Sequence, residues 1–242
     1  MSLSLERLTG ADTVVLCVHG IQGNPSKFLW LTRRLPAEID YLCVLLPGHG
    51  ISSKEFAQSG SKEWLDFLRH TLQELSQKYR RIICVGHSMG SLLGILAASD
   101  RTFPALHGLM LLSCPFSLGK ATRYAVGRWF TGLFSEVPKL KTDDEDTVSA
   151  RLLQHPMYPK PYLGLFQLMS MARRQLSMLK LPVFAVHSDG DEIVSPRSLE
   201  LLARHARART VVVPESGHFL YSEAAQQMII DGLFSLLGNE NT

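Results

Sequence analysis

Residues 81–100 (RIICVGHSMGSLLGILAASD) constrain the fold of this chain more than any other stretch. An apolar run over 82–85 leads into a G-x-S-x-G pentapeptide centred on Ser88, and small and apolar residues at helical spacing follow. This order predicts a strand, a sharp turn and a helix, in which Gly86 and Gly90 lack the Cβ atoms that would collide across the turn. We expect the turn to lift the Ser88 hydroxyl above the sheet edge as a nucleophile. The alternative is an ordinary glycine-rich turn with a solvated serine.

Short apolar runs and longer helical patterns alternate along the rest of the chain. The predicted strands are 14–18, 41–45, 82–85, 108–112, 183–186 and 210–213, and the predicted helices are 26–35, 61–79, 89–98, 196–206 and 222–237. The strands are nearly all apolar, which is typical of a parallel sheet covered on both faces. The alternation therefore predicts an α/β fold with a mostly parallel sheet flanked by helices. Residues 3–8 are a candidate antiparallel edge strand.

One segment, 115–161, interrupts this alternation. It contains no predicted strand, is rich in aromatic residues and ends in a proline-rich run over 155–161. Because 242 residues are ordinary for a single α/β domain, we expect one domain, with a core of 1–114 and 162–242 and a small helical cap formed by 115–161. The candidate substrate-pocket residues of the cap are Phe116, Trp129, Phe130 and Phe134. The alternative for each of them is packing of the cap onto the core.

Composition limits the function classes. A formal net charge of +3 is too small to argue for a nucleic-acid partner, and no apolar run is long enough to span a bilayer. The four cysteines lack metal-ligand spacing, residues 1–10 lack a secretory signal, and the acidic run 143–146 suits a helix N-terminus better than a metal site. We therefore expect a soluble cytoplasmic protein with free thiols, no metal and no integral membrane association. The sequence does not indicate an oligomeric state.

A serine nucleophile needs a general base, a carboxylate that orients the base and donors for the oxyanion. In this architecture the chain order is serine, acid, histidine. Among nine histidines, His218 fits best, because it lies between the last predicted strand and the last predicted helix, at the expected sheet edge of Ser88. His87 adjoins Ser88, so we expect its ring to point elsewhere. His49 is second in line as the base.

Three acids follow the fifth predicted strand: Asp189, Asp191 and Glu192. Asp191 is preferred because it precedes an apolar pair that can anchor the loop and a proline that can open the next helix. Its expected role is to accept the Nδ1 proton of His218, which fixes the tautomer and stabilises the imidazolium. Asp189 and Glu192 stay open as rivals.

The expected oxyanion donors are two backbone N–H groups. One belongs to Met89, the residue after the nucleophile, and the other to the loop that follows the first parallel strand. Ile21 is the preferred donor in that loop, and Gln22 is the alternative. The same loop contains Asn24 and Pro25, which predict the N-cap and the first residue of a helix.

Together these segments resemble the α/β-hydrolase superfamily over nearly the whole chain. The resemblance rests on residues 19–20, 47–50, 86–90, Asp191 and 216–218. Within the superfamily, the small cap and the Gly-His-Gly loop are similar to those of compact bacterial carboxylesterases and of monoacylglycerol-lipase and serine-aminopeptidase-like hydrolases. Relatives often carry a glycine earlier in the run before the acid, and this departure keeps Asp189 open beside Asp191.

The resemblance implies an α/β-hydrolase fold, a catalytic triad and no cofactor. The implied triad is Ser88, Asp191 and His218, with Ile21 and Met89 as oxyanion donors. We expect a serine carboxylesterase, with monoacylglycerol lipase as one form of it, that cleaves small to medium apolar carboxylic esters as a small-molecule substrate. Thioesterase, lactonase and peptidase are variants among enzymes, and a catalytically silent scaffold that binds a ligand or a protein is the alternative from another class.

Overall fold

The computed structural model describes residues 4–50, 52–99, 103–120 and 159–238. Most of the predicted cap lies outside the described residues, including Trp129, Phe130, Phe134 and the acidic run 143–146. Within the described ranges, no helix combines the length and the apolar character needed to cross a membrane.

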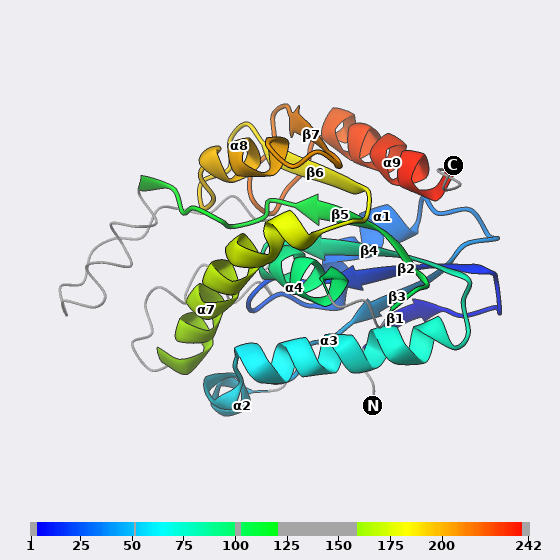
Figure 1. Ribbon diagram of the computed structural model, residues 1–242, viewed down its shortest axis with the longest axis horizontal. Coiled ribbons are helices and arrows are strands. Elements are labelled where there is room, and N and C mark those ends of the chain that lie inside the picture. Colours follow the sequence, from blue (N-terminus) through cyan, green and yellow to red (C-terminus); the bar gives the residue numbers. More distant parts are fainter. Residues whose placement is uncertain (1–3, 51, 100–102, 121–158, 239–242) are drawn as a thin grey trace.

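Seven strands of the described chain form one sheet in the order β1-β3-β2-β4-β5-β6-β7 (Figure 1). Their bounds are Leu5–Arg7 (β1), Thr13–Val18 (β2), Asp40–Val44 (β3), Arg81–His87 (β4), Leu106–Leu112 (β5), Val183–Ser188 (β6) and Ala208–Val213 (β7). β1 runs antiparallel to β3, and the other neighbouring pairs are parallel. The predicted mostly parallel sheet is confirmed, and so is the antiparallel edge strand.

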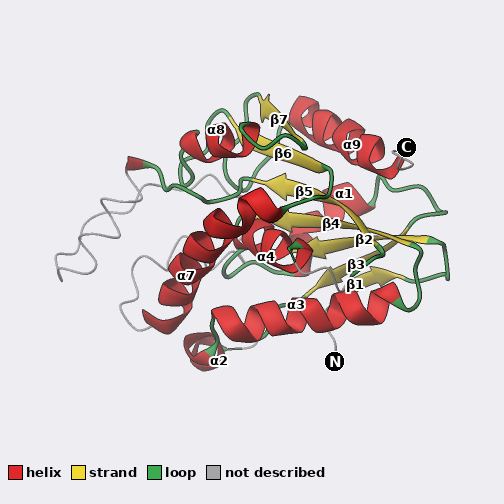
Figure 2. Cartoon of the chain, in the orientation of Figure 1, coloured by secondary structure: helices red, strands yellow, loops and turns green. Residues whose placement is uncertain are grey.

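The helices cover both faces of the sheet (Figure 2). The described helices are η1 (3₁₀, Pro25–Phe28), α1 (Leu29–Thr32), α2 (Ser53–Gln58), α3 (Ser61–Ser76), α4 (Met89–Ala98), α7 (Pro159–Gln175), η2 (3₁₀, Leu176–Met178), α8 (Arg197–Ala203) and α9 (Glu223–Gly238). Apolar residues of α3, α4 and α7 share one buried cluster with the sheet, whereas those of η1 and α9 share a second cluster. The sheet therefore separates two hydrophobic cores.

Strand β2 shows why the strands of this sheet are continuous apolar runs in the sequence. Val14, Leu16 and Val18 belong to the first cluster, whereas Val15 and Cys17 belong to the second. Successive side chains of a strand point to opposite faces. Because both faces are covered, both sets must be apolar.

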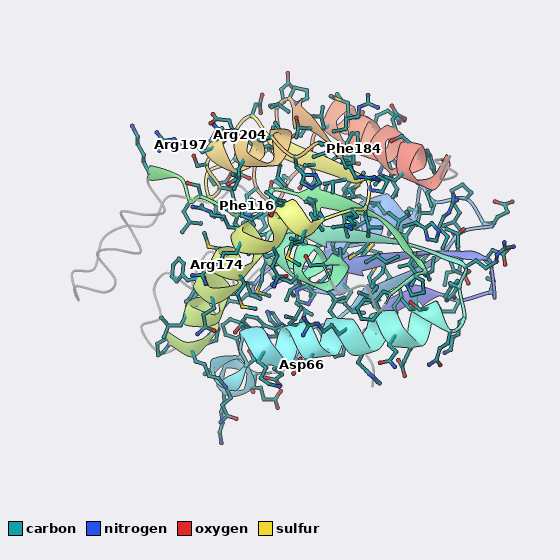
Figure 3. The ribbon with its side chains drawn as sticks, in the orientation of Figure 1. Asp66, Phe116, Arg174, Phe184, Arg197 and Arg204 are labelled. Carbon is teal, nitrogen blue, oxygen red and sulfur yellow. The ribbon has the colours of Figure 1, made fainter. Side chains whose placement is uncertain are left out.

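Helix α9 packs closely on β6. Phe184 lies on β6 and is labelled in Figure 3. Its ring lies against Gly232 of α9, where an added Cβ would approach ring atoms to 2.4 Å. Only glycine allows this approach of helix to strand. The loop that contains His218 connects β7 to α9, so this packing fixes one end of that loop.

The predicted helix that follows the first parallel strand differs from the structure. The helix predicted over 26–35 is a 3₁₀ turn, η1, followed by the short helix α1. Its predicted start is right, because the Asn24 side chain caps it, accepting the Ser26 N–H at 2.9 Å, with Pro25 as the first residue.

Helices α2 and α7 are not predicted by the sequence patterns. Pro159 and Pro161, from the proline-rich run 155–161, lie in the first turn of α7. A proline costs little there, because the first N–H groups of a helix have no intrahelical acceptor. α7 packs against α4, and an added Cβ at Gly164 would lie 2.8 Å from the backbone nitrogen of Ser61 at the start of α3.

Candidate active site

Ser88 occupies the turn between β4 and α4 in a strained conformation. Its φ is 52° and its ψ is −117°, a region that non-glycine residues rarely adopt. An added Cβ at Gly86 would lie 2.5 Å from backbone atoms of Gly90, and one at Gly90 would lie 2.0 Å from the carbonyl oxygen of Val18. Glycine is therefore required at both positions. At Gly86 the collision would be across the turn, as the sequence predicts, whereas at Gly90 it would be with the end of β2.

His218 lies in the loop between β7 and α9 and meets Asp191 from the loop after β6. Its Nδ1 is 3.0 Å from Oδ2 and 3.1 Å from Oδ1 of Asp191, and both side chains are almost fully buried. Because a carboxylate can only accept, Nδ1 carries the proton of the neutral ring, and Nε2 is its basic nitrogen. This is the arrangement that a general base requires.

Asp191 is held as an ion. Burial alone would raise its pKa, but the charge of His218 and the hydrogen bond from its ring outweigh burial. The N–H groups of Ile193 and Val194 also donate to Oδ1, at 3.0 and 2.8 Å. The pKa of Asp191 therefore lies well below its usual range.

The two rival carboxylates have other partners. Asp189 accepts the N–H groups of Glu215 at 3.0 Å and Ser216 at 3.2 Å, and these hydrogen bonds lower its pKa. Glu192 accepts the backbone N–H of His218 at 3.0 Å. Both acids therefore hold the loop that carries His218, while the carboxylate of Asp191 contacts the ring itself.

His87 does not point away from the site, contrary to the expectation from sequence. Its Nε2 lies 2.8 Å from the backbone oxygen of His218, and the two ring centroids are 5.0 Å apart. Since His87 immediately precedes Ser88, this contact brings the strained turn and the histidine loop together. The sequence gives no signal for it, because the partner is a backbone atom far along the chain.

The loop after β2 passes close to Ser88. An added Cβ at Gly20 would lie 3.0 Å from Cβ of Ser88. His19 fixes this loop: its Nε2 accepts the Leu46 N–H at 3.0 Å, so its Nδ1 carries the proton and donates to the Gly20 oxygen at 2.7 Å. Burial, followed by the effect of His49, lowers the pKa of His19 to about 3, so the ring is neutral.

The two expected oxyanion donors adjoin these residues in the chain: Met89 follows Ser88, and Ile21 follows Gly20. Met89 is buried and is the first residue of α4, where backbone N–H groups have no intrahelical acceptor. Ile21 is partly buried and packs against the first core cluster. Its neighbour Gln22 has a φ of 55°, and the turn closes with a hydrogen bond from the Gly23 N–H to the Gly20 oxygen at 3.0 Å.

Two further candidate residues from the sequence, His49 and Phe116, are buried among packed side chains. His49, second in line as the base, packs edge-on against His19 and contacts the rings of Phe56 and Trp64, and burial lowers its pKa to about 4. Phe116, a pocket candidate, is 2% exposed within the first core cluster, near the end of α7 (Figure 3). The packing interpretation of Phe116 is therefore favoured.

Within the ranges that the structure describes, no group of three or more His, Cys, Asp or Glu side chains could hold a metal ion. The four cysteines, which are all buried, are free thiols.

Comparisons with known proteins agree with this fold. A family model described as "Alpha/beta hydrolase family" matches residues 15–229. A thermostable monoacylglycerol lipase from Bacillus sp. (strain H-257) is 23% identical over 230 residues, which cover 90% of this chain and 87% of that protein. The dihydrolipoyllysine-residue acetyltransferase component of an acetoin cleaving system from Pseudomonas putida is 25% identical over 244 residues, and the match spans only 61% of that protein.

Solved structures show the same architecture. A monoacylglycerol lipase from Paleococcus ferrophilus has a TM-score of 0.73 at 20% identity, covering 98% of this chain and 99% of that chain. One of two metagenome-derived lipolytic enzymes, LipS and LipT, has a TM-score of 0.77 at 18% identity, covering 98% of both chains. At these identities the likeness shows a common fold.

Proposed function

The chain belongs to the alpha/beta hydrolase family, and from that premise we propose that it is a serine carboxylesterase that cleaves small to medium apolar carboxylic esters through an acyl-enzyme intermediate. The observation that carries the proposal is the buried pair of Asp191 and His218, which His87 joins to the strained turn of Ser88. A solvated serine in an ordinary turn would need neither the strain nor the buried pair.

The proposed reaction uses each group in turn. As Oγ of Ser88 attacks the ester carbonyl carbon, Nε2 of His218 takes its proton, and Asp191 stabilises the imidazolium. The backbone N–H groups of Ile21 and Met89 stabilise the oxyanion. The C–O bond then breaks, and the alcohol leaves with the proton from His218. A water molecule, activated by the same histidine, releases the acid and restores Ser88.

The ester class is supported by two independent features. Relatives that share the fold include monoacylglycerol lipases and lipolytic enzymes. The predicted cap over 115–161 also contains Trp129, Phe130 and Phe134, which suit an apolar acyl or alcohol group. Phe116 packs in the core, so the pocket proposal rests on the other three aromatic residues.

We further propose that the enzyme works in a reducing compartment such as the cytoplasm. All four cysteines are buried free thiols, and proteins that keep such thiols are typical of reducing surroundings.

Monoacylglycerols are candidate substrates within this proposal.

The test is covalent labelling with a fluorophosphonate, followed by a series of p-nitrophenyl esters of increasing acyl length. We expect stoichiometric modification of wild type at Ser88 and none of Ser88→Ala. Ser99→Ala, at the end of α4, is the matched control and should be labelled like wild type. A protein that takes up no label and hydrolyses no ester would instead be a binding scaffold, and label on a different serine would refute the assignment of Ser88.

A further inference from the structure

His87 lies where three segments meet. It precedes Ser88 in the chain, and its Nε2 is 2.8 Å from the backbone oxygen of His218. An added Cβ at Gly20 would approach Nδ1, the other ring nitrogen, to 3.3 Å. One imidazole therefore contacts the nucleophile turn, the loop of the base and the loop of the expected oxyanion donor.

The hydrogen bond determines the tautomer of His87. A carbonyl oxygen can only accept, so Nε2 must carry a proton and donate it. Burial, together with the charges of His218 and Lys27, lowers the pKa of His87 to about 3, although the bond to the carbonyl and the charge of Asp191 oppose this. The ring is therefore neutral, with Nδ1 unprotonated.

The bond joins a rigid element to a loop. The end of β4 is fixed by its pairing with β5, and the N–H of Ser88 donates to the Leu112 oxygen at 2.8 Å. The loop of His218 has no such ladder, and Glu215 within it adopts a φ of 50°. On the other side of His218, its backbone N–H donates to Glu192 at 3.0 Å. The backbone of His218 is thus held at both its N–H and its carbonyl.

We propose that His87 is a positioning residue that holds the general base in register with the nucleophile, by donating from Nε2 to the backbone carbonyl of His218. This inference rests on the proposed function, because it assigns His218 the role of base. Active-site groups must be held within about 0.5 Å of the productive geometry, and a hydrogen bond to the backbone of the base fixes its whole loop.

The decisive comparison uses two amides of different reach. The side-chain nitrogen of Gln lies where Nε2 of histidine lies, whereas that of Asn reaches only as far as Nδ1. His87→Gln should therefore keep most of the wild-type kcat. His87→Asn and His87→Ala should lower kcat about ten- to hundredfold with KM changed less than about twofold, because a misplacement of about 1 Å costs up to about 100-fold.

His70→Ala on the exposed face of α3 is the matched control and should match wild type in kcat and KM. Thermal unfolding verifies that each variant is folded. Equal kcat values for the Gln and Asn variants would overturn the proposal, and so would a rise in KM at unchanged kcat, since that pattern indicates a binding or packing role.

The labelling rate separates this inference from the proposed function. The second-order rate of fluorophosphonate labelling should fall in His87→Asn in parallel with kcat/KM. If wild type takes up no label, the proposed function fails. If wild type is labelled and His87→Asn is labelled at the same rate, the proposed function stands and the role of His87 is wrong.

A spectroscopic measurement needs no activity at all. Long-range ¹H–¹⁵N correlation spectra of the wild-type protein distinguish the two neutral tautomers of each histidine. His87 should carry its proton on Nε2 and stay neutral from pH 8 to pH 5. A proton on Nδ1, or titration within that range, would exclude a donor bond from Nε2 to the carbonyl and overturn the inference.

Discussion

Oδ2 of Asp191 lies 3.0 Å from Nδ1 of His218, with 0% and 2% of the two side chains exposed. The two residues come from different loops at the same edge of a parallel sheet, after β6 and after β7. The carboxylate also accepts the backbone N–H groups of Ile193 and Val194, so its position does not depend on the ring alone. This contact favours Asp191 over Asp189 and Glu192 as the acid that orients His218.

The first prediction concerns those acids. Asp191→Asn should lower kcat about 10⁴-fold, because the amide favours the wrong tautomer of His218. Asp189→Asn should change kcat little, because Asp189 accepts the backbone N–H groups of Glu215 and Ser216 and Asn keeps one acceptor oxygen. Steady-state kinetics on one p-nitrophenyl ester measures both. The reverse ranking would move the acid to Asp189.

The second prediction compares two glycines of helix α4. Gly90→Ala should destabilise the protein by about 1–3 kcal/mol or more and abolish activity, because its Cβ would lie 2.0 Å from the carbonyl oxygen of Val18. At Gly94 the nearest atom to an added Cβ is Sγ of Cys84 at 3.5 Å, an ordinary contact. Gly94→Ala should therefore leave activity intact and add up to about 1 kcal/mol of stability.

Denaturant unfolding and ester hydrolysis, measured on Gly90→Ala and Gly94→Ala, test this prediction. If Gly90→Ala retained wild-type stability and kcat, the turn would be more adaptable than its geometry indicates. Gly94→Ala controls for the effect of a methyl group in the same helix.

The third prediction is a loss of stability in mild acid that comes from buried histidines. Burial and neighbouring groups lower the pKa of His19 to about 3, and burial lowers that of His49 to about 4. The unfolded chain has histidine pKa values near 6.5, so below that pH it binds more protons than the folded chain. Stability should therefore be full above about pH 6.5 and fall as the pH drops towards 4.

Each such histidine contributes a slope of up to about 1.4 kcal/mol per pH unit in this window. His49→Phe removes one of them and suits the contacts with Phe56 and Trp64. Its free energy of unfolding, measured in urea between pH 7.5 and 4.5, should depend less steeply on pH than that of wild type. His70→Ala, which removes an exposed histidine, is the control. An unchanged slope in His49→Phe would mean that His49 is not buried in its neutral form.

The sheet and the nucleophile turn could be predicted because their signals are local. The apolar run before Ser88 and the glycines around it specify the strand and the turn by short-range sterics, and these predictions are confirmed by β4 and by the positive φ of Ser88. The signal for the last helix is likewise local. The periodic pattern predicts a helix over 222–237, which differs from α9 by one residue at each end.

The missed features depend on partners that are distant in the chain. His87 and Glu192 both bind the backbone of His218, and nothing in the local sequence indicates which backbone group a side chain will reach. The prolines of α7 are ambiguous for a related reason. Pro159 and Pro161 suit a helix start as well as an extended linker, and packing of α7 against α4 decides between the two.

The fourth prediction tests whether the predicted cap sets acyl-chain preference. Trp129, Phe130 and Phe134 lie in the segment between β5 and β6 for which the sequence predicts no strand. If they bury the acyl chain, each added CH₂ gains about 0.8 kcal/mol, which is roughly fourfold in kcat/KM until the pocket is full. Alanine at each of these positions should therefore flatten the profile of kcat/KM against acyl length more than it lowers turnover of the acetate ester.

Phe234→Ala is the matched control, because Phe234 is 37% exposed on α9, which packs on the opposite face of the sheet from α4 and α7. It should leave the slope of the profile unchanged. Measurement of kcat/KM for p-nitrophenyl esters from acetate upwards gives the slope for each variant. If all three aromatic variants kept the wild-type slope, these residues would pack the segment instead of binding substrate, since a packing role alters all chain lengths alike. The source of acyl specificity would then have to lie in the core of the molecule.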